Sequence, residues 1–296
     1  MIGVLLMAHG TPESLDEMPE YLRLVRGGRV PSVELVEEMR HNYAAIGGRS
    51  PLTEISQAQG RALQELLDDK GIQSLVVVGM RNWKPFIADA IRTLINAGVS
   101  RIVGIPLAPQ FSSLSVQKYV AAAEAALPPG VPFGCIRSFH DHPWLIEAFA
   151  GRLREVAPQP DEEVVFTAHS LPVRVVDAGD PYPREVAATA AAIARMCGLQ
   201  HYQQAWQSAG RTPEPWLSPD LSDFIRERIV EGISAFLVVP IGFVCDHTEI
   251  LFDIDVQAAT VARDLGVSLR RTPSLNTAST FIRTLGDLVT RELARA

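Results

Sequence analysis

The sequence predicts an α/β protein built from two similar halves, each a mainly parallel sheet flanked by helices. Short apolar runs rich in β-branched residues alternate with longer stretches of helical periodicity, which is the pattern of successive βαβ units. This alternation occurs twice along 296 residues, a length that suits two domains. Helices on both faces of a parallel sheet form a Rossmann-like layer structure, so we expect one in each half, with a cleft between them.

The first half is predicted to span residues 1–157. Its opening run carries no basic residue before it, so it is interpreted as a strand and not as a secretion signal. The predicted strands are Ile2–Ala8, Ser74–Met80, Arg101–Ala108 and Pro132–Arg137, and the predicted helices between them include Thr53–Asp69 and Pro85–Ala97.

The second half is predicted to span residues 158–275. The proline-bearing stretch Ala157–Asp161 interrupts the helical pattern and marks the boundary. A predicted helix, Arg184–Cys197, separates the first two of its strands, which are Glu163–Ala168, Tyr202–Gln207, Ala235–Ile241 and Val267–Arg271. The last segment, 276–296, is a predicted helix that is free to pack back on either half, the first included. Its apolar face consists of Phe281, Ile282, Leu285, Leu288, Val289 and Leu293.

Composition limits the classes of partner and the compartment. A net charge of −7 disfavours nucleic acid as the main partner. The longest uncharged apolar stretch, Ile233–Cys245, is interrupted by Pro240 and Gly242 and falls short of the roughly 20 residues of a membrane helix, so no span is expected. The three cysteines are widely separated and odd in number, which suits reduced thiols. We therefore expect a cytoplasmic protein.

Polar residues follow several predicted strands. Ligands of α/β sheets bind beyond the carboxyl ends of the strands, so these residues mark the expected cleft. The segments are His9–Pro12, Arg81–Trp83, Pro109–Ser113 and His169–Ser170. The chain contains no phosphate-binding loop, nucleophile elbow or dinucleotide fingerprint, and Cys245–Glu249 lacks the paired spacing of a structural zinc site. We therefore expect no resident cofactor.

A histidine and a carboxylate are the leading candidates for chemistry. His169 ends a strand-like run at the expected cleft mouth, although this position alone also fits a histidine satisfied by local hydrogen bonds. If the chain becomes helical after residue 246, Glu249, Asp253 and Gln257 fall on one face at four-residue spacing. Such a ladder also fits a solvated face. Because it directly follows the most apolar run of the chain, it favours a buried carboxylate with an altered proton affinity.

Further motifs stand in a fixed order along nearly the whole chain. They are Met7–Pro12, Tyr43–Leu52, Leu107–Ser112, Thr167–Pro172, Gly179–Pro183, Trp206–Ser208, Pro215–Leu217, Val239–Phe243 and Asp246–Glu249. Together they resemble the ferrochelatase family and are most similar to the coproporphyrin-type enzymes of Gram-positive and related bacteria. The resemblance implies the chelatase type of two-halved α/β fold.

The resemblance also implies roles for the cleft residues. His169 and Glu249 match the family's two central residues, catalytic and metal-binding, one on each side of the porphyrin metal centre. An imidazole and a carboxylate suit a site that holds ferrous iron, releases it and accepts two pyrrole protons. Which of the two accepts the protons stays open. Asp253 and Gln257 extend a polar relay toward solvent, although the family usually has an acid in place of Gln257.

Other positions match residues that contact the porphyrin macrocycle or its propionates. They are His9, Arg26, Tyr43, Ser50 and Tyr119. An arginine suits a propionate because its planar fork pairs with a carboxylate through two hydrogen bonds. His9 stands where some relatives carry tyrosine, so it either ligates product iron or donates a hydrogen bond.

The implied activity is insertion of Fe²⁺, a substrate, into a free-base porphyrin of heme biosynthesis, with release of two pyrrole protons. Coproporphyrin III is favoured, giving coproheme, because the segment between Thr11 and Tyr43 is short, contains four arginines and lacks the long apolar lip of protoporphyrin-type relatives. The alternatives are protoporphyrin IX, a cobalt or nickel chelatase for another tetrapyrrole, and a non-enzymatic tetrapyrrole-binding protein. Expected partners are the two substrates and the preceding and following enzymes of the pathway.

Overall fold

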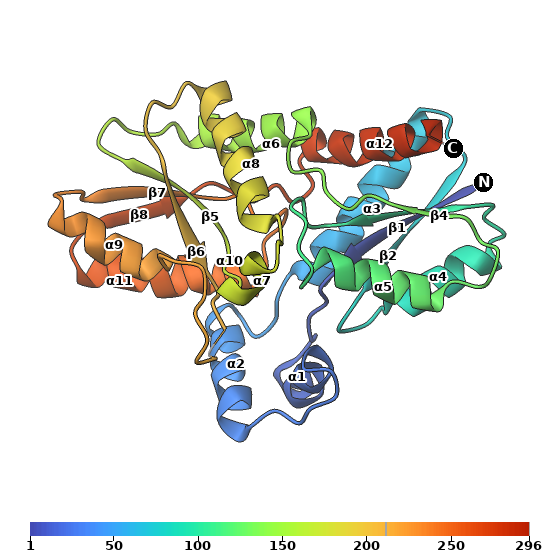
Figure 1. Ribbon diagram of the computed structural model, residues 1–296, viewed down its shortest axis with the longest axis horizontal. Coiled ribbons are helices and arrows are strands. Elements are labelled where there is room, and N and C mark those ends of the chain that lie inside the picture. The colour runs from blue at the N-terminus through green and yellow to red at the C-terminus, as the bar shows by residue number, and fades with distance from the viewer. Residues whose placement is uncertain (211, 296) are drawn as a thin grey trace.

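The computed structural model describes residues 1–210 and 212–295, and within these ranges the chain forms two four-stranded parallel sheets (Figure 1). The first has the strand order β2-β1-β3-β4 and the second the order β6-β5-β7-β8, so the two halves share one topology. The strands are β1 (Ile2–Ala8), β2 (Ser74–Met80), β3 (Ile102–Pro106), β4 (Phe133–Cys135), β5 (Glu163–His169), β6 (Gln203–Gln207), β7 (Ala235–Pro240) and β8 (Ser268–Arg271). The predicted fold class is confirmed.

The central strands have unbroken apolar sequences because helices cover both faces of each sheet. Nearly every residue of β1 and every residue of β7 is buried, as expected for parallel strands between two helical layers. The predicted strands agree with the observed ones to within a few residues at their ends. Ser74–Met80 is observed as predicted, whereas Arg101–Ala108 is shortened to Ile102–Pro106.

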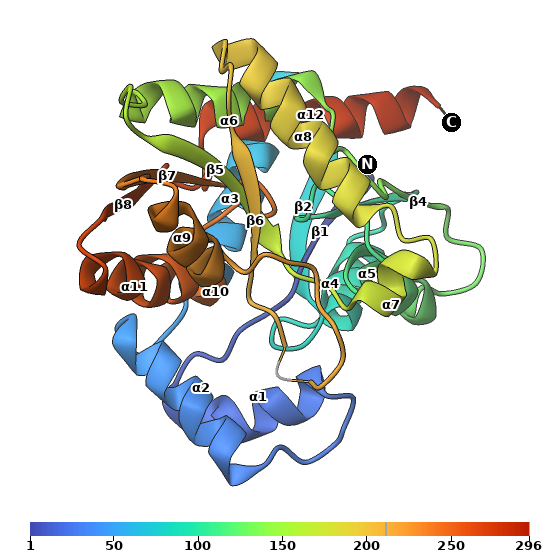
Figure 2. The same cartoon turned by 60° about the vertical axis from the view of Figure 1, so that its left-hand side comes forward.

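The helices of the first half form a layer on the sheet and a separate lip. They are α1 (Met18–Val25), which follows a short 3₁₀ turn (Leu15–Glu17), α2 (Val33–Ala45), α3 (Leu52–Asp69), α4 (Ile87–Asn96) and α5 (Val116–Ala126). The last three pack on the strands, whereas α1 and α2 lie below both sheets in Figures 1 and 2. The lip has a small core of its own, made of Met18, Tyr21, Leu22, Val36, Tyr43 and Trp83.

The second half has shorter helices around the segment that follows β7. They are α7 (Val173–Asp177), α8 (Tyr182–Cys197), α9 (Leu221–Val230), α10 (Thr248–Leu251), a π-helix (Asp253–Ala258) and α11 (Ala259–Asp264). The expectation that Glu249, Asp253 and Gln257 share one face of a regular α-helix is wrong. A π-helix follows α10, and a π turn is wider than an α turn. Among the helices in the described ranges, none combines the length and apolar character that crossing a bilayer requires.

Two helices cross between the halves. α6 (Pro143–Val156) precedes the predicted boundary at residue 157 but packs on α8 of the second half. α12 (Ser279–Ala294) comes last and packs on α3, on α6 and on β3. It corresponds to the helix predicted over 276–296, of which residue 296 lies outside the described residues. Helix packing therefore crosses the boundary that the sequence predicts at residue 157.

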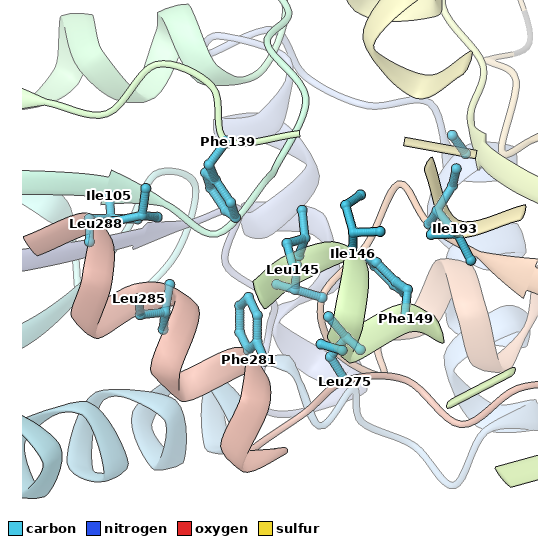
Figure 3. Packing of buried hydrophobic residues seen from close by; sticks show 14 of the residues in the cluster. Ile105, Phe139, Leu145, Ile146, Phe149, Ile193, Leu275, Phe281, Leu285 and Leu288 are labelled. Atoms are coloured by element: carbon cyan, nitrogen blue, oxygen red, sulfur yellow. The ribbon is translucent and has the colours of Figure 1, made fainter. Parts of the chain in front are cut away.

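The crossing helices join the two halves into one apolar core. Figure 3 shows side chains of α6 and α12, among them Leu145 and Phe281, between Ile105 of β3 and Ile193 of α8. All four side chains are fully buried. Truncation of a buried phenylalanine such as Phe281 to alanine costs about 3–5 kcal/mol, so this junction contributes strongly to stability.

Two buried glutamines of the first half hydrogen-bond to the second. Gln59 of α3 donates its side-chain amide to the carbonyl oxygens of Val244, at 3.3 Å, and Asn276, at 2.9 Å. Gln110, which follows β3, donates its amide to the carbonyl of Ile241 at 3.1 Å. Ile241 and Val244 both belong to the segment after β7. The first half therefore holds the segment that leads into α10.

Gly242 allows this segment to approach the end of β5. A Cβ atom at position 242 would lie 2.7 Å from the Cβ of Ala168 and 2.8 Å from its Cα. It would also lie 3.4 Å from the backbone nitrogen of His169. Any side chain at position 242 must therefore displace the last residues of β5.

We predict that Gly242→Ala lowers the free energy of unfolding by about 1–3 kcal/mol, because the clash with backbone cannot be relieved by a rotamer change. Gly151→Ala in α6 is the matched control, since a Cβ there meets nothing within 4 Å. It should stabilise the protein by about 0.5–1 kcal/mol through helix propensity. Urea unfolding measures both values, and equal stability of the two variants would contradict the close approach.

Candidate active site

A cavity of about 610 Å³ lies between the halves. This volume falls within the range of about 300–1,000 Å³ that is usual for small-molecule sites. All four strand-end segments contribute to its wall, through His9 after β1, Arg81 after β2, Gln110 after β3 and His169 at the end of β5. The two parallel sheets thus direct their carboxyl ends at one cleft, as the sequence predicts.

Glu249 lies between two imidazoles in this cavity. Its Oε1 is 3.8 Å from Nε2 of His169, and its Oε2 is 3.6 Å from Nε2 of His247. β5 supplies His169, whereas the other two come from the start of α10. The structure therefore brings together the two residues that the sequence selects and adds a second histidine.

Both imidazoles present an unprotonated Nε2 to the carboxylate when they are neutral. Nδ1 of His169 donates to the carbonyl of Ser170, and Nδ1 of His247 donates to the carbonyl of Cys245 at 3.0 Å. The Nε2 lone pairs then face carboxylate oxygens, and a cation between them, either a proton or a metal ion, relieves the repulsion. Within the described residues, no three side chains of metal-binding type gather into a metal site.

The pKa values of Glu249 and Asp253 shift in opposite directions in this cavity. Burial alone raises the pKa of Glu249, but His169, His247 and His9 outweigh it and lower the pKa to about 2. Burial and repulsion by Glu249 raise the pKa of Asp253 to about 7. For His247, the pull of Glu249 overcomes burial and raises the pKa. One carboxylate is thus a permanent anion, and its neighbour titrates near neutrality.

His9, which follows β1, also lines the cavity. Burial first, and then the nearby charge of Arg81, lower the pKa of its imidazole to about 4 despite the attraction of Glu249. The side-chain nitrogen of Asn82 is 3.1 Å from Nε2, and the ring of Tyr21 packs edge-on at 6.4 Å between centroids. At neutral pH His9 is therefore uncharged and keeps a nitrogen lone pair.

The remaining members of the polar ladder also line the cavity. Asp253 accepts a hydrogen bond from the Ser208 hydroxyl, and Gln257 lies farther along the same wall. Gln207 donates its amide to the backbone carbonyl of Glu249 at 2.6 Å, which fixes the start of α10 against β6. The π turn thus keeps all three ladder residues on the cavity wall.

The predicted porphyrin contacts fall into two groups. Tyr43, Ser50 and Tyr119 are buried and line the cavity, and the Tyr43 hydroxyl is 2.8 Å from the hydroxyl of Thr11. Arg26, by contrast, is exposed at the end of α1 and is not among the cavity-lining residues. The resemblance therefore selects four positions, His9 included, that the structure brings to the cavity and one that it does not.

The sequence predicted no role for three residues that line the cavity. His247 could have been found from its spacing, two positions before Glu249, and Arg81 from its place after β2, in a segment expected at the cleft. Gln207 ends β6 directly beside His169, in register with it across the sheet. Position at the end of a strand was the signal for Arg81 and Gln207.

Asp246 fixes the segment that carries His247 and Glu249. It accepts hydrogen bonds from Ser274 at 2.7 Å and from Asn276 at 2.8 Å, and Arg271 lies 3.1 Å away. Burial raises the pKa of Asp246, but the hydrogen bonds from Asn276 and Ser274 and the charge of Arg271 hold it below its ordinary value. The ionised form therefore stabilises the fold.

We predict that Asp246→Asn lowers the free energy of unfolding by about 1–3 kcal/mol at neutral pH. The pKa of Asp246 is lower in the folded than in the unfolded chain, so its contribution is present above about pH 4 and is lost as the pH falls through the folded pKa. Urea unfolding at about pH 7 and about pH 3 should show the difference from the unaltered chain shrinking at low pH.

Asp264→Asn is the control for this comparison, because that side chain is 68% exposed and makes only a loose pair with Arg263. It should change stability by no more than a few tenths of a kcal/mol. A destabilisation by Asp246→Asn that is independent of pH would show that its charge is not responsible.

Comparison with known proteins gives relatives over the full length of the chain. The chain is 44% identical over 304 residues to a ferrochelatase of Deinococcus radiodurans, covering 99% of this chain and 96% of the relative. It is 39% identical over 303 residues to a coproporphyrin III ferrochelatase of Geobacillus sp. WCH70, covering 99% and 98%. These levels of identity over whole chains indicate common ancestry.

A solved structure shares the fold at low identity. The sirohydrochlorin chelatase SirB from Bacillus subtilis subspecies spizizenii, in complex with cobalt, superposes with a TM-score of 0.56 at 12% identity, over 98% of this chain and 94% of that one. This similarity shows the two-halved fold alone. The family model for ferrochelatase matches residues 1–293. With that match and the relatives above, the chain belongs to the ferrochelatase family of metal chelatases.

Proposed function

We propose that this chain inserts ferrous iron into free-base coproporphyrin III, giving coproheme and two protons. The observation that carries the proposal is Glu249 between the Nε2 atoms of His169 and His247 in the central cavity. This group offers iron an anionic oxygen and imidazole nitrogens without enclosing it. Such an open site suits an ion that must be passed on. The Geobacillus relative named for coproporphyrin III supports this choice of porphyrin.

His169 and Glu249 are the proposed iron-binding and catalytic residues. Insertion of Fe²⁺ displaces one proton from each of two pyrrole nitrogens, so two protons must leave the cavity for every iron that enters. A carboxylate with a pKa of about 2 is a poor base at neutral pH. We therefore assign proton acceptance to the imidazoles of His169 and His247 and electrostatic attraction of iron to Glu249.

Asp253 is the proposed exit for these protons. A group whose pKa is about 7 exchanges protons readily in both directions at neutral pH. Gln257, farther along the wall, carries an amide that does not ionise, so it contributes polarity and no protonation step. The relay consequently ends at Asp253 and the solvent that reaches it.

The proposed porphyrin contacts follow from the cavity wall. Tyr43, Ser50 and Tyr119 surround the space for the macrocycle. The neutral imidazole of His9 has a lone pair that suits ligation of product iron. A propionate that reaches Arg26 must extend beyond the cavity wall, since this arginine is exposed on the lip.

We expect no resident cofactor, since the reaction transfers iron without a change in its oxidation state and the groups named above account for its protons. Heme biosynthesis is the pathway of the family. An enzyme that supplies the porphyrin and one that consumes coproheme are therefore the proposed protein partners.

We predict iron insertion when the chain is incubated anaerobically with Fe²⁺ and either coproporphyrin III or protoporphyrin IX, with a higher kcat/KM for coproporphyrin III. Absorption spectra measure metallation, in buffer with and without detergent. His169→Ala should abolish metallation but leave porphyrin binding and folding intact, because the histidine binds iron and protons and not the macrocycle edge. A preference for protoporphyrin IX in both buffers would overturn the substrate, and full activity of His169→Ala would overturn the site.

We predict that Asp253→Asn removes a step near pH 7 from the profile of kcat/KM against pH and lowers the rate by about 10–100-fold. Glu249→Gln should be more damaging, because the amide has no charge to attract iron. Steady-state assays from about pH 6 to about pH 9 measure both effects. If the step near pH 7 persists in Asp253→Asn, another group is responsible for it.

A further inference from the structure

Arg81 is a cation on the cavity wall whose side chain has no partner among the described residues. Its backbone N–H donates to the carbonyl of Ala8 at 2.9 Å, which continues the pairing of β2 with β1 and fixes the residue beside His9. The guanidinium makes no hydrogen bond or ion pair within residues 1–210 and 212–295. Its position is therefore set by the sheet, while its charge is left for a ligand.

Several arginines of the same half are already paired with a carboxylate. Arg23 contacts Glu20 at 2.7 Å on α1, and Arg92 contacts Asp89 at 2.9 Å on α4. A guanidinium has five N–H donors in a planar fork, and a carboxylate ligand accepts two of them at once. Arg26, Arg61 and Arg101 also lack a side-chain hydrogen bond or ion pair among the described residues, but of the four only Arg81 lines the cavity.

A second cation lies close to Arg81. Lys118, in the first turn of α5, is exposed and likewise has no ion pair or hydrogen bond from its side chain among the described residues. Burial and the nearby charges of Arg81 and Arg174 lower the pKa of Lys118, which places the cations within electrostatic reach of one another. Arg174 is neutralised by Glu214 at 2.6 Å. An anion bound at Arg81 reduces the repulsion between Arg81 and Lys118, although Lys118 itself is not among the cavity-lining residues.

We propose that Arg81, assisted by Lys118, binds a peripheral carboxylate of the porphyrin substrate. The inference rests on the proposed function, because it assumes that the tetrapyrrole occupies this cavity. A planar guanidinium matches a carboxylate through two parallel hydrogen bonds, and a partly buried wall strengthens them. The subsite lies on the wall formed by β2 and α5, whereas Tyr43 and Ser50 belong to the segment from α2 to α3. Carboxylates anchored on two walls fix the rotation of the macrocycle above Glu249.

Fluorescence titration without metal tests the subsite with coproporphyrin III and with its tetramethyl ester, both in the same detergent-containing buffer. The ester has the same macrocycle and nearly the same size but no charge. Arg81→Leu should raise the Kd for the acid about tenfold, which is the size expected for one charge-assisted pair, and should leave the Kd for the ester within about twofold. Arg81→Lys should restore part of the affinity, and Lys118→Ala should have a smaller effect because its side chain is exposed.

Arg92→Leu is the matched control, since it removes the same charge from an exposed helix of the same half outside the cavity. It should leave both Kd values unchanged. Equal weakening of acid and ester by Arg81→Leu, or no weakening of the acid, overturns the carboxylate subsite while the proposed function stands. If the unaltered chain binds neither porphyrin, the proposed function fails and the subsite fails with it. Circular dichroism verifies that each variant is folded. If Arg81→Leu does not fold, Arg81→Lys and Lys118→Ala provide the test.

Discussion

The side-chain hydrogen bonds of Gln59 and Gln110 are the constraint on which the arrangement of the cleft depends. Both amides belong to the first half, and both donate to carbonyl oxygens of the segment after β7 in the second. A buried carbonyl that loses its donor costs about 1–3 kcal/mol, so the halves resist separation along this edge. Glu249 is therefore held at a set position relative to His9 and Arg81 before any ligand enters. A cleft built in this way has its groups preorganised.

At the centre of the cleft, the negative charge lies on the Glu249 carboxylate, which is flanked by the imidazole nitrogens of His169 and His247. Because Nδ1 of both His169 and His247 is committed to backbone carbonyls, their Nε2 atoms compete for the same cation at Glu249. A metal ion that enters must displace protons, and protons that return favour release of the metal. Asp253 has the opposite character, since repulsion from Glu249 keeps it near its point of half-ionisation at neutral pH. The difference between these two acids comes from their neighbours, not from their residue type.

Much of this organisation could be predicted from the sequence because it depends on local patterns. Apolar runs define the strands, and the residues after them identify the cleft, as His169 illustrates. The π-helix at Asp253–Ala258 could not be predicted. The four-residue spacing of the polar side chains indicates a helix, but it does not distinguish an α turn from the wider π turn. The exposed position of Arg26 could not be predicted either. Arg81 follows a predicted strand and lies at the cleft as expected, whereas only the path of the backbone places Arg26 on the lip.

The exchange of α6 and α12 decides when each half of the molecule can fold. During synthesis the first sheet emerges long before α12, whose Phe281 and Leu285 complete the core beside α3. Domains of larger proteins commonly fold in order from the N-terminus as they leave the ribosome. Here the apolar surface of α3 and β3 stays uncovered until about residue 294 has been made. The core of the first half is therefore completed only after the second half has been synthesised, and until then its apolar surface is accessible to chaperones that bind nascent chains.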